Sequence, residues 1–96
     1  MILIADSGAT KTDWCFGNTL HDCQVVHTEG INPFHLTEEK IKQILLESLI
    51  LQLPFSKEEV KAVFFYGAGC TPEKAGKLSN LLAEAFPYAT IQVESD

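Results

Sequence analysis

Short apolar runs in the first thirty residues predict three β-strands. Residues 2–5 are continuously apolar, which is typical of a strand that is buried on both faces. Residues 13–17 and residues 23–28 predict a second and a third strand, and the Gly17-Asn18 pair between them has the composition of a hairpin turn. Because only short turns separate these runs, we expect an antiparallel β-meander.

Two later segments carry apolar residues at helical spacing, and a proline follows each of them. Residues 37–53 begin with Thr37 as an N-cap, and their wide apolar face predicts burial against a sheet on one side and a second helix on the other. Residues 71–86 begin with Thr71 as an N-cap and Pro72 at the first helical position, and they carry a clean apolar stripe.

Two further apolar runs complete the pattern. Residues 60–66 have the composition of a buried parallel strand, and residues 90–93 predict a last strand. The order is therefore β-β-β-α-β-α-β, and right-handed crossovers give an α/β fold with a five-stranded mixed sheet and helices packed on it. We expect one domain over residues 1–96 that forms part of a larger protein, because the sequence stops directly after a strand.

Composition and charge exclude several classes of function. With 46% hydrophobic and 21% charged residues, the chain of 96 residues has the composition of a globular domain rather than a disordered one. The formal net charge of -6 argues against nucleic acid as a partner, since phosphate backbones require a basic surface. No apolar run is long enough to cross a membrane, and none resembles a secretory signal. We therefore expect a cytoplasmic location.

The cysteines and histidines show no spacing typical of a metal site. Cys15, Cys23 and Cys70 are odd in number and form no CxxC pair, which favours reduced thiols. We expect Cys15 and Cys23 to face the core as small apolar residues. The three histidines lack the spacing of zinc ligands, and no orienting base lies near Cys70 in the sequence.

The richest cluster of polar groups is the stretch DSGATKT at the end of the first predicted strand. Asp6 would be held rigidly at the edge of the sheet, and Gly8 permits a tight turn. Thr10 and Thr12 offer hydroxyl groups, and Lys11 offers a positive charge. These groups could bind phosphate oxygens and a hydrated Mg²⁺ ion, although a plain polar β-turn has the same composition. A strand follows instead of a helix, which excludes a Walker A loop and a Rossmann fingerprint.

The DxGxTxT hairpin and the element order resemble the first half of the actin/hexokinase/Hsp70 ATPase superfamily, which has a ribonuclease H-like fold. Together with GINPFH, YGAG and the terminal ESD, the stretch ADSGATKTDW is similar to the BadF/BadG/BcrA/BcrD ATPase family, which contains N-acetylglucosamine kinases. The resemblance implies the N-terminal part of an ATP-dependent sugar kinase. Its substrate would be N-acetylglucosamine or a related amino sugar, phosphorylated at the 6-hydroxyl.

The resemblance also implies a role for each matching residue of the hairpin. The Asp6 carboxylate would orient Mg²⁺ through water, and ATP phosphates would contact the three hairpin residues Gly8, Thr10 and Lys11.

The remaining matches concern the sugar. Asn32 would contact it, Gly67 and Gly69 would line the cleft, and Asp96 would take the proton from the attacking hydroxyl. A carboxylate suits that task because phosphoryl transfer needs a base within hydrogen-bond reach of the nucleophile.

The sequence departs from a whole kinase, because the second phosphate loop and the adenosine pocket have no counterpart in these residues. We expect the 96 residues alone to be inactive and the larger protein to form a homodimer. Two alternatives stay open. One is an ATPase activator of the 2-hydroxyacyl-CoA dehydratase type, which the absence of cluster-ligand cysteine spacing disfavours. The other is a nucleotide-gated interaction module.

Overall fold

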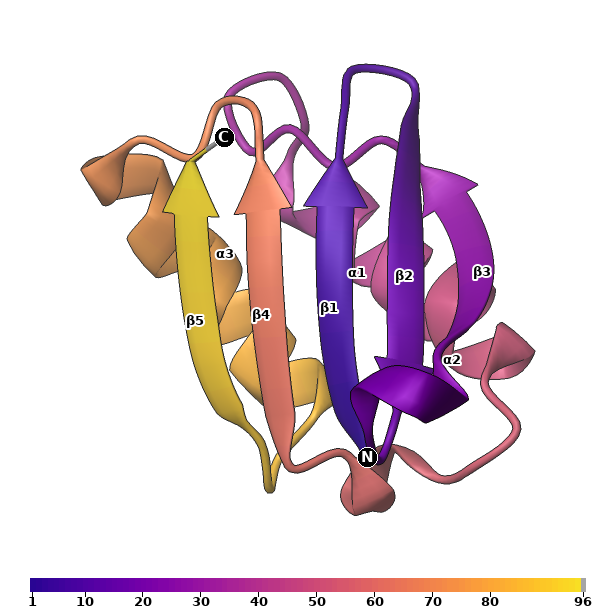
Figure 1. Ribbon diagram of the computed structural model, residues 1–96. Helices are drawn as coiled ribbons and strands as arrows, with labels where there is room; N and C mark the ends of the chain where they lie inside the picture. Colours follow the sequence, from indigo (N-terminus) through magenta and orange to yellow (C-terminus); the bar gives the residue numbers. More distant parts are fainter. Residues whose placement is uncertain (96) are drawn as a thin grey trace.

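The computed structural model describes residues 1–95 and contains one five-stranded sheet in the order β3-β2-β1-β4-β5 (Figure 1). Strands β1, β2 and β3 pair antiparallel, whereas β4 runs parallel to β1 and β5 parallel to β4. The predicted meander and mixed sheet are thus confirmed. The strands are β1 (Ile2–Ser7), β2 (Lys11–Gly17), β3 (Gln24–Glu29), β4 (Ala62–Gly67) and β5 (Thr90–Ser95).

The long helices all pack on one face of the sheet (Figure 1). The connections β3 to β4 and β4 to β5 both move toward the β5 edge, and right-handed crossovers in one direction place their helices on the same side. The helical segments are α1 (Glu38–Gln43), the π-helical η2 (Ile44–Leu49), α2 (Ile50–Gln52) and α3 (Pro72–Ala85), with short 3₁₀ turns η1 (Leu20–Asp22) and η3 (Lys57–Glu59).

The predicted helix over residues 37–53 begins as expected, with the Thr37 side chain accepting a hydrogen bond from the Lys40 amide. It then passes through the π-helical stretch η2, which was not foreseen. The prediction that its wide apolar face is buried on two sides is wrong in part, because Leu46 and Leu51 are exposed. These side chains lie on the solvent side, since α1 and α3 sit next to each other on the same sheet face.

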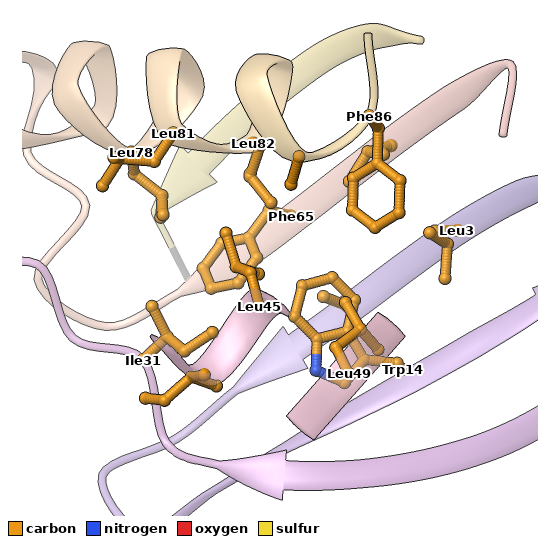
Figure 2. Packing of buried hydrophobic residues seen from close by; sticks show 14 of the residues in the cluster. Leu3, Trp14, Ile31, Leu45, Leu49, Phe65, Leu78, Leu81, Leu82 and Phe86 are labelled. Atoms are coloured by element: carbon orange, nitrogen blue, oxygen red, sulfur yellow. The ribbon is translucent and has the colours of Figure 1, made fainter. Parts of the chain in front are cut away.

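The hydrophobic core lies between the sheet and the helices (Figure 2). Its largest fully buried side chain is Trp14, whose ring lies 5.8 Å from that of Phe65, centroid to centroid. The indole Nε1 of Trp14 donates a hydrogen bond of 3.0 Å to the Thr28 hydroxyl, so its polar atom is satisfied inside the core. The helices contribute the leucines that surround these rings, Leu45, Leu49, Leu78, Leu81 and Leu82.

The opposite face of the sheet carries no long helix among residues 1–95. In β1, buried and exposed residues alternate, and Ile2 and Ile4 are 39% and 37% exposed. The prediction that residues 2–5 are buried on both faces is therefore wrong. A continuous apolar run does not show which face of a sheet the helices cover. The direction of the two crossovers does show this, because it places both helical connections on the same face.

Cys15 and Cys23 form a disulfide, with Cα atoms 5.9 Å apart. The expectation of reduced thiols facing the core is wrong for this pair. Cys15 lies on the face of β2 opposite the core, and the η1 turn brings the exposed Cys23 back beside it. The third cysteine, Cys70, is buried.

We expect Cys15→Ser to lower the free energy of unfolding by about 2 kcal/mol, because the disulfide closes a short loop in the unfolded chain. Urea denaturation of both chains without reductant measures the difference. Peptide mapping without reductant should recover Cys15 and Cys23 in one linked peptide pair. Two separate peptides, together with equal stabilities of the two chains, would contradict the disulfide.

Within residues 1–95, no helix is both long and apolar enough to cross a lipid bilayer.

Candidate functional site

Three loops meet at the end of the sheet where β1, β4 and β5 finish (Figure 1). They are the β1–β2 turn at residues 8–10, the segment at residues 30–36, and the β4–α3 connection at residues 68–71. Gly30 lies so close to the backbone carbonyls of the first turn that a side chain there would collide with them. The carboxyl ends of adjacent parallel strands are the usual place for ligand sites in α/β proteins.

Ser7, the last residue of β1, connects these loops through buried hydrogen bonds. Its hydroxyl oxygen accepts from the Ile31 amide at 2.9 Å and lies 2.7 Å from the Thr12 hydroxyl. The Ser7 carbonyl accepts from the Ala68 amide at 3.3 Å, and the Thr12 hydroxyl donates to the Glu29 carbonyl at 3.0 Å. Thr12 is therefore buried and already bonded within the protein, contrary to the expectation that its hydroxyl is offered to a ligand.

Sequence reasoning did not identify Ser7 as part of the site. One signal was available, because strand alternation puts Ser7 on the same face as Leu3 and Ala5, which are buried. A serine on the core face at a strand end must find hydrogen-bond partners, since an unpaired buried hydroxyl is unfavourable.

Asp6 points to the opposite face of the sheet and is exposed. Its neighbours across the sheet are Asp13 on β2 and Tyr66 on β4. The Asp13 carboxylate lies 2.7 Å from His27 Nδ1 and 3.8 Å from Lys11 Nζ. The carboxylates of Asp6 and Asp13 and the ammonium group of Lys11 therefore lie together beside the β1–β2 turn. Such a mixture of charges suits a cation that is bound together with an anionic ligand.

The turn itself presents a smaller set of donors than the sequence predicts. The Gly8 amide donates to the Lys11 carbonyl at 2.9 Å and so closes the turn. The hydroxyl of Thr10 and the ammonium of Lys11 are exposed. Of the three residues that the resemblance assigns to phosphate binding, two thus offer accessible side-chain donors, and the role of Gly8 in the structure is to shape the turn.

The structure brings Asn32 and Gly69 into direct contact, although they are far apart in the sequence. Gly69 has φ +77°, and a Cβ atom there would overlap the Asn32 side-chain amide. The Asn32 Oδ1 atom also accepts a hydrogen bond of 2.9 Å from the Phe34 amide. Asn32 and Gly69, two of the residues predicted to lie at the sugar, therefore belong to one packed unit.

Gly67 occupies a different environment from Gly69. It is buried, and a Cβ atom there would press against the Phe65 ring and the Ser7 side chain. As a glycine, it could contact a ligand only through its backbone atoms. Its place in the cleft stays a prediction. Asp96, the predicted base, follows Ser95 directly and lies outside the described residues.

A groove of about 560 Å³ opens beside Gly69, between the N-terminus of α3 and the end of β5. The positive end of the helix dipole faces this groove and favours a negatively charged group. Its lining residues are Gly69, Cys70, Thr71, Pro72, Ala75, Val93, Glu94 and Ser95.

The side chains near the β1–β2 turn fit a magnesium ion that keeps its water better than a metal ion held entirely by protein ligands. Among residues 1–95, no three side chains of the metal-binding types His, Cys, Asp and Glu are grouped closely enough to hold a metal. Mg²⁺ keeps most of its water and typically takes one or two carboxylates together with substrate phosphates. Asp6 can supply such a carboxylate.

Comparison with solved structures reveals a strong likeness to a crystal structure of a proposed N-acetylglucosamine kinase from Porphyromonas gingivalis. The TM-score is 0.91 and the sequence identity is 40%, over 100% of this chain and 34% of that chain. The chain thus spans about a third of the length of this neighbour. No protein-family model and no curated protein matches the sequence. With its five-stranded mixed sheet, the chain has the actin-like ATPase fold predicted from its hairpin motif and is similar to a proposed kinase.

Proposed function

We propose that the chain is the N-terminal subdomain of a larger ATP-dependent sugar kinase that acts on N-acetylglucosamine or a related amino sugar. The observation that carries the proposal is the 40% identity, over the whole chain, to a proposed N-acetylglucosamine kinase. The proposal also places this chain in the BadF/BadG/BcrA/BcrD ATPase family, on the basis of its ADSGATKTDW and GINPFH motifs.

In this proposal the β1–β2 turn binds the phosphate end of ATP. Thr10 and Lys11 contact phosphate oxygens, Gly8 shapes the turn, and Asp6 holds a water of the Mg²⁺ ion. The ion would neutralise the charge that builds up on the phosphates during transfer. The exposed positions of Thr10, Lys11 and Asp6 support these roles.

The sugar lies near Asn32 and the Gly67–Gly69 connection, with Asp96 as the base. The sugar 6-hydroxyl oxygen attacks the γ-phosphorus while Asp96 accepts its proton, and the bond from the γ-phosphorus to the bridging oxygen breaks to release ADP. The groove beside Gly69 supports this placement, because its lining ends at Ser95, next to Asp96 in the chain.

The larger protein would supply the adenosine pocket and the second phosphate loop. The neighbour, of which the matched region covers 34%, supports a protein of about three times this length. A homodimer in the cytoplasm, where ATP is abundant, completes the proposal. Disulfides such as that between Cys15 and Cys23 are uncommon in that compartment. Recovery of the linked peptide pair in the mapping proposed above would therefore argue against the cytoplasmic location.

We expect the polypeptide that contains these residues to transfer phosphate from MgATP to N-acetylglucosamine in a coupled assay. Residues 1–96 alone should show no turnover. Asp96→Asn should lower kcat by at least about 100-fold while the affinity for the sugar is retained, because an amide cannot accept the hydroxyl proton.

Asp22 provides a matched control, because its exposed carboxylate lies in the η1 turn at the opposite end of the sheet, and Asp22→Asn should keep most of the activity. Normal turnover of Asp96→Asn would show that Asp96 is not the base. ATP hydrolysis that is independent of any sugar would overturn the kinase proposal and favour an ATPase activator or a nucleotide-gated module.

A further inference from the structure

A row of charged contacts begins at the β1–β2 turn and crosses from β2 to β3. Asp13 on β2 lies opposite His27 on β3 in the sheet register, and His27 Nδ1 lies 2.7 Å from Asp13 Oδ1. Because a carboxylate can only accept, the ring nitrogen donates this hydrogen bond. The Lys11 ammonium lies 3.8 Å from the same Oδ1 atom, which is beyond hydrogen-bond distance. His27 thus holds the oxygen atom that Lys11 would otherwise approach.

The second carboxylate beside Lys11 has a partner of its own. Glu29 on β3 lies opposite Lys11 in the register, and its Oε1 atom is 3.2 Å from the Lys40 ammonium. The Lys11 side chain is 67% exposed. Both acidic neighbours of Lys11 on these strands are therefore engaged by other groups, and its ammonium is accessible to a ligand at the turn.

The Lys11 ammonium can serve a ligand well only if no carboxylate of the protein holds it tightly. A lysine in a close ion pair must give up that pair before it can bind a phosphate oxygen, and the affinity for the phosphate falls by the strength of the pair. The imidazole N–H at Asp13 Oδ1 takes the place that the ammonium would fill in such a pair.

We propose that His27 is a positioning residue for nucleotide binding, because it holds Asp13 and so keeps the Lys11 ammonium free to bind a phosphate oxygen of ATP. This inference rests on the proposed function, which assigns Lys11 to the phosphates. His27 acts through Asp13 and makes no contact with the nucleotide itself.

His27→Ala in the longer polypeptide should raise the Kd for the magnesium complex of β,γ-imido-ATP by about 2- to 5-fold, the range that one exposed ion pair supplies. The affinity falls because Asp13 Oδ1 can then pair with Lys11. Isothermal titration calorimetry without sugar measures the Kd. His21→Ala is the matched control, because His21 is exposed and lies in the η1 turn at the opposite end of the sheet, and it should leave the Kd unchanged.

A second comparison separates positioning from a general loss of structure. In an Asp13→Asn background, His27→Ala should leave the Kd unchanged, because the competing negative charge is already absent. A merely structural role of His27 would lower the affinity in both backgrounds. An equal loss of affinity in both backgrounds, or no loss in either, would overturn the proposal.

The same measurements separate this inference from the proposed function. Nucleotide binding needs no sugar, so the expected pattern of Kd values in a protein that phosphorylates no sugar would refute the kinase and leave the role of His27 standing. Sugar phosphorylation together with a Kd that His27→Ala does not change would do the reverse. A longer polypeptide that binds no nucleotide would refute both.

Discussion

Replacing Trp14 by alanine is expected to lower the free energy of unfolding by about 3–5 kcal/mol. The side chain is fully buried, packs against Phe65 and donates a hydrogen bond to Thr28. Its loss leaves a cavity in the centre of the core and one buried hydroxyl without its donor. Small domains are stable by only about 5–15 kcal/mol in total, so a large part of the stability would be lost.

Urea denaturation followed by circular dichroism measures this effect. Tyr88→Ala is the matched control, because Tyr88 is an aromatic residue that is largely exposed, and it should change the stability little. Trp14→Phe should fall between the two, since it keeps an aromatic ring and loses only part of the volume and the N–H donor. A loss below about 1 kcal/mol for Trp14→Ala would contradict the assignment of Trp14 to the centre of the core.

Gly69→Ala is expected to destabilise the protein by at least about 2 kcal/mol. The backbone at Gly69 has φ +77°, which is costly for any residue with a side chain. The added methyl group would also overlap the Asn32 amide, so the 30–36 segment would have to move. In the longer polypeptide, we expect a weaker affinity for the sugar in addition to the lower stability.

Gly76 provides the control for this substitution. It lies inside α3, and a Cβ atom there would meet no other atom within 4 Å. Gly76→Ala should therefore raise the stability by about 0.5–1 kcal/mol, because alanine favours the helix. Denaturation midpoints of the two variants should move in opposite directions. A neutral Gly69→Ala would show that the loop adopts another conformation in solution.

Much of the fold could be predicted from local signals. The N-caps Thr37 and Thr71, Pro72 at the start of α3 and the apolar runs of the strands all lie where the structure confirms them. These features depend on neighbouring residues, so the sequence is sufficient to find them. The π-helical stretch η2 and the exposed side of β1 were missed, because they depend on how distant elements pack.

In the candidate site, too, only the features that depend on neighbouring residues could be predicted. Its hairpin could be located from the DSGATKT motif, whereas the contact of Asn32 with Gly69 depends on the folding of two separate loops. The Cys15–Cys23 pair was missed for a similar reason, since the η1 turn that brings them together has no clear sequence signature. The buried bonds of Ser7 and Thr12 were missed because the sequence pattern placed both residues in a polar turn, which is usually solvated, whereas they lie in β1 and β2.

The Ser7 hydroxyl has a mechanical consequence for the proposed kinase. One side chain anchors the β1–β2 turn, through Thr12, and the segment at residues 30–36, through Ile31. Neither loop can shift alone without breaking a buried hydrogen bond, at a cost of about 1–3 kcal/mol. In the proposed kinase these two loops would therefore move together as one rigid unit, and closure around the substrates would have to come from the part of the protein outside residues 1–96.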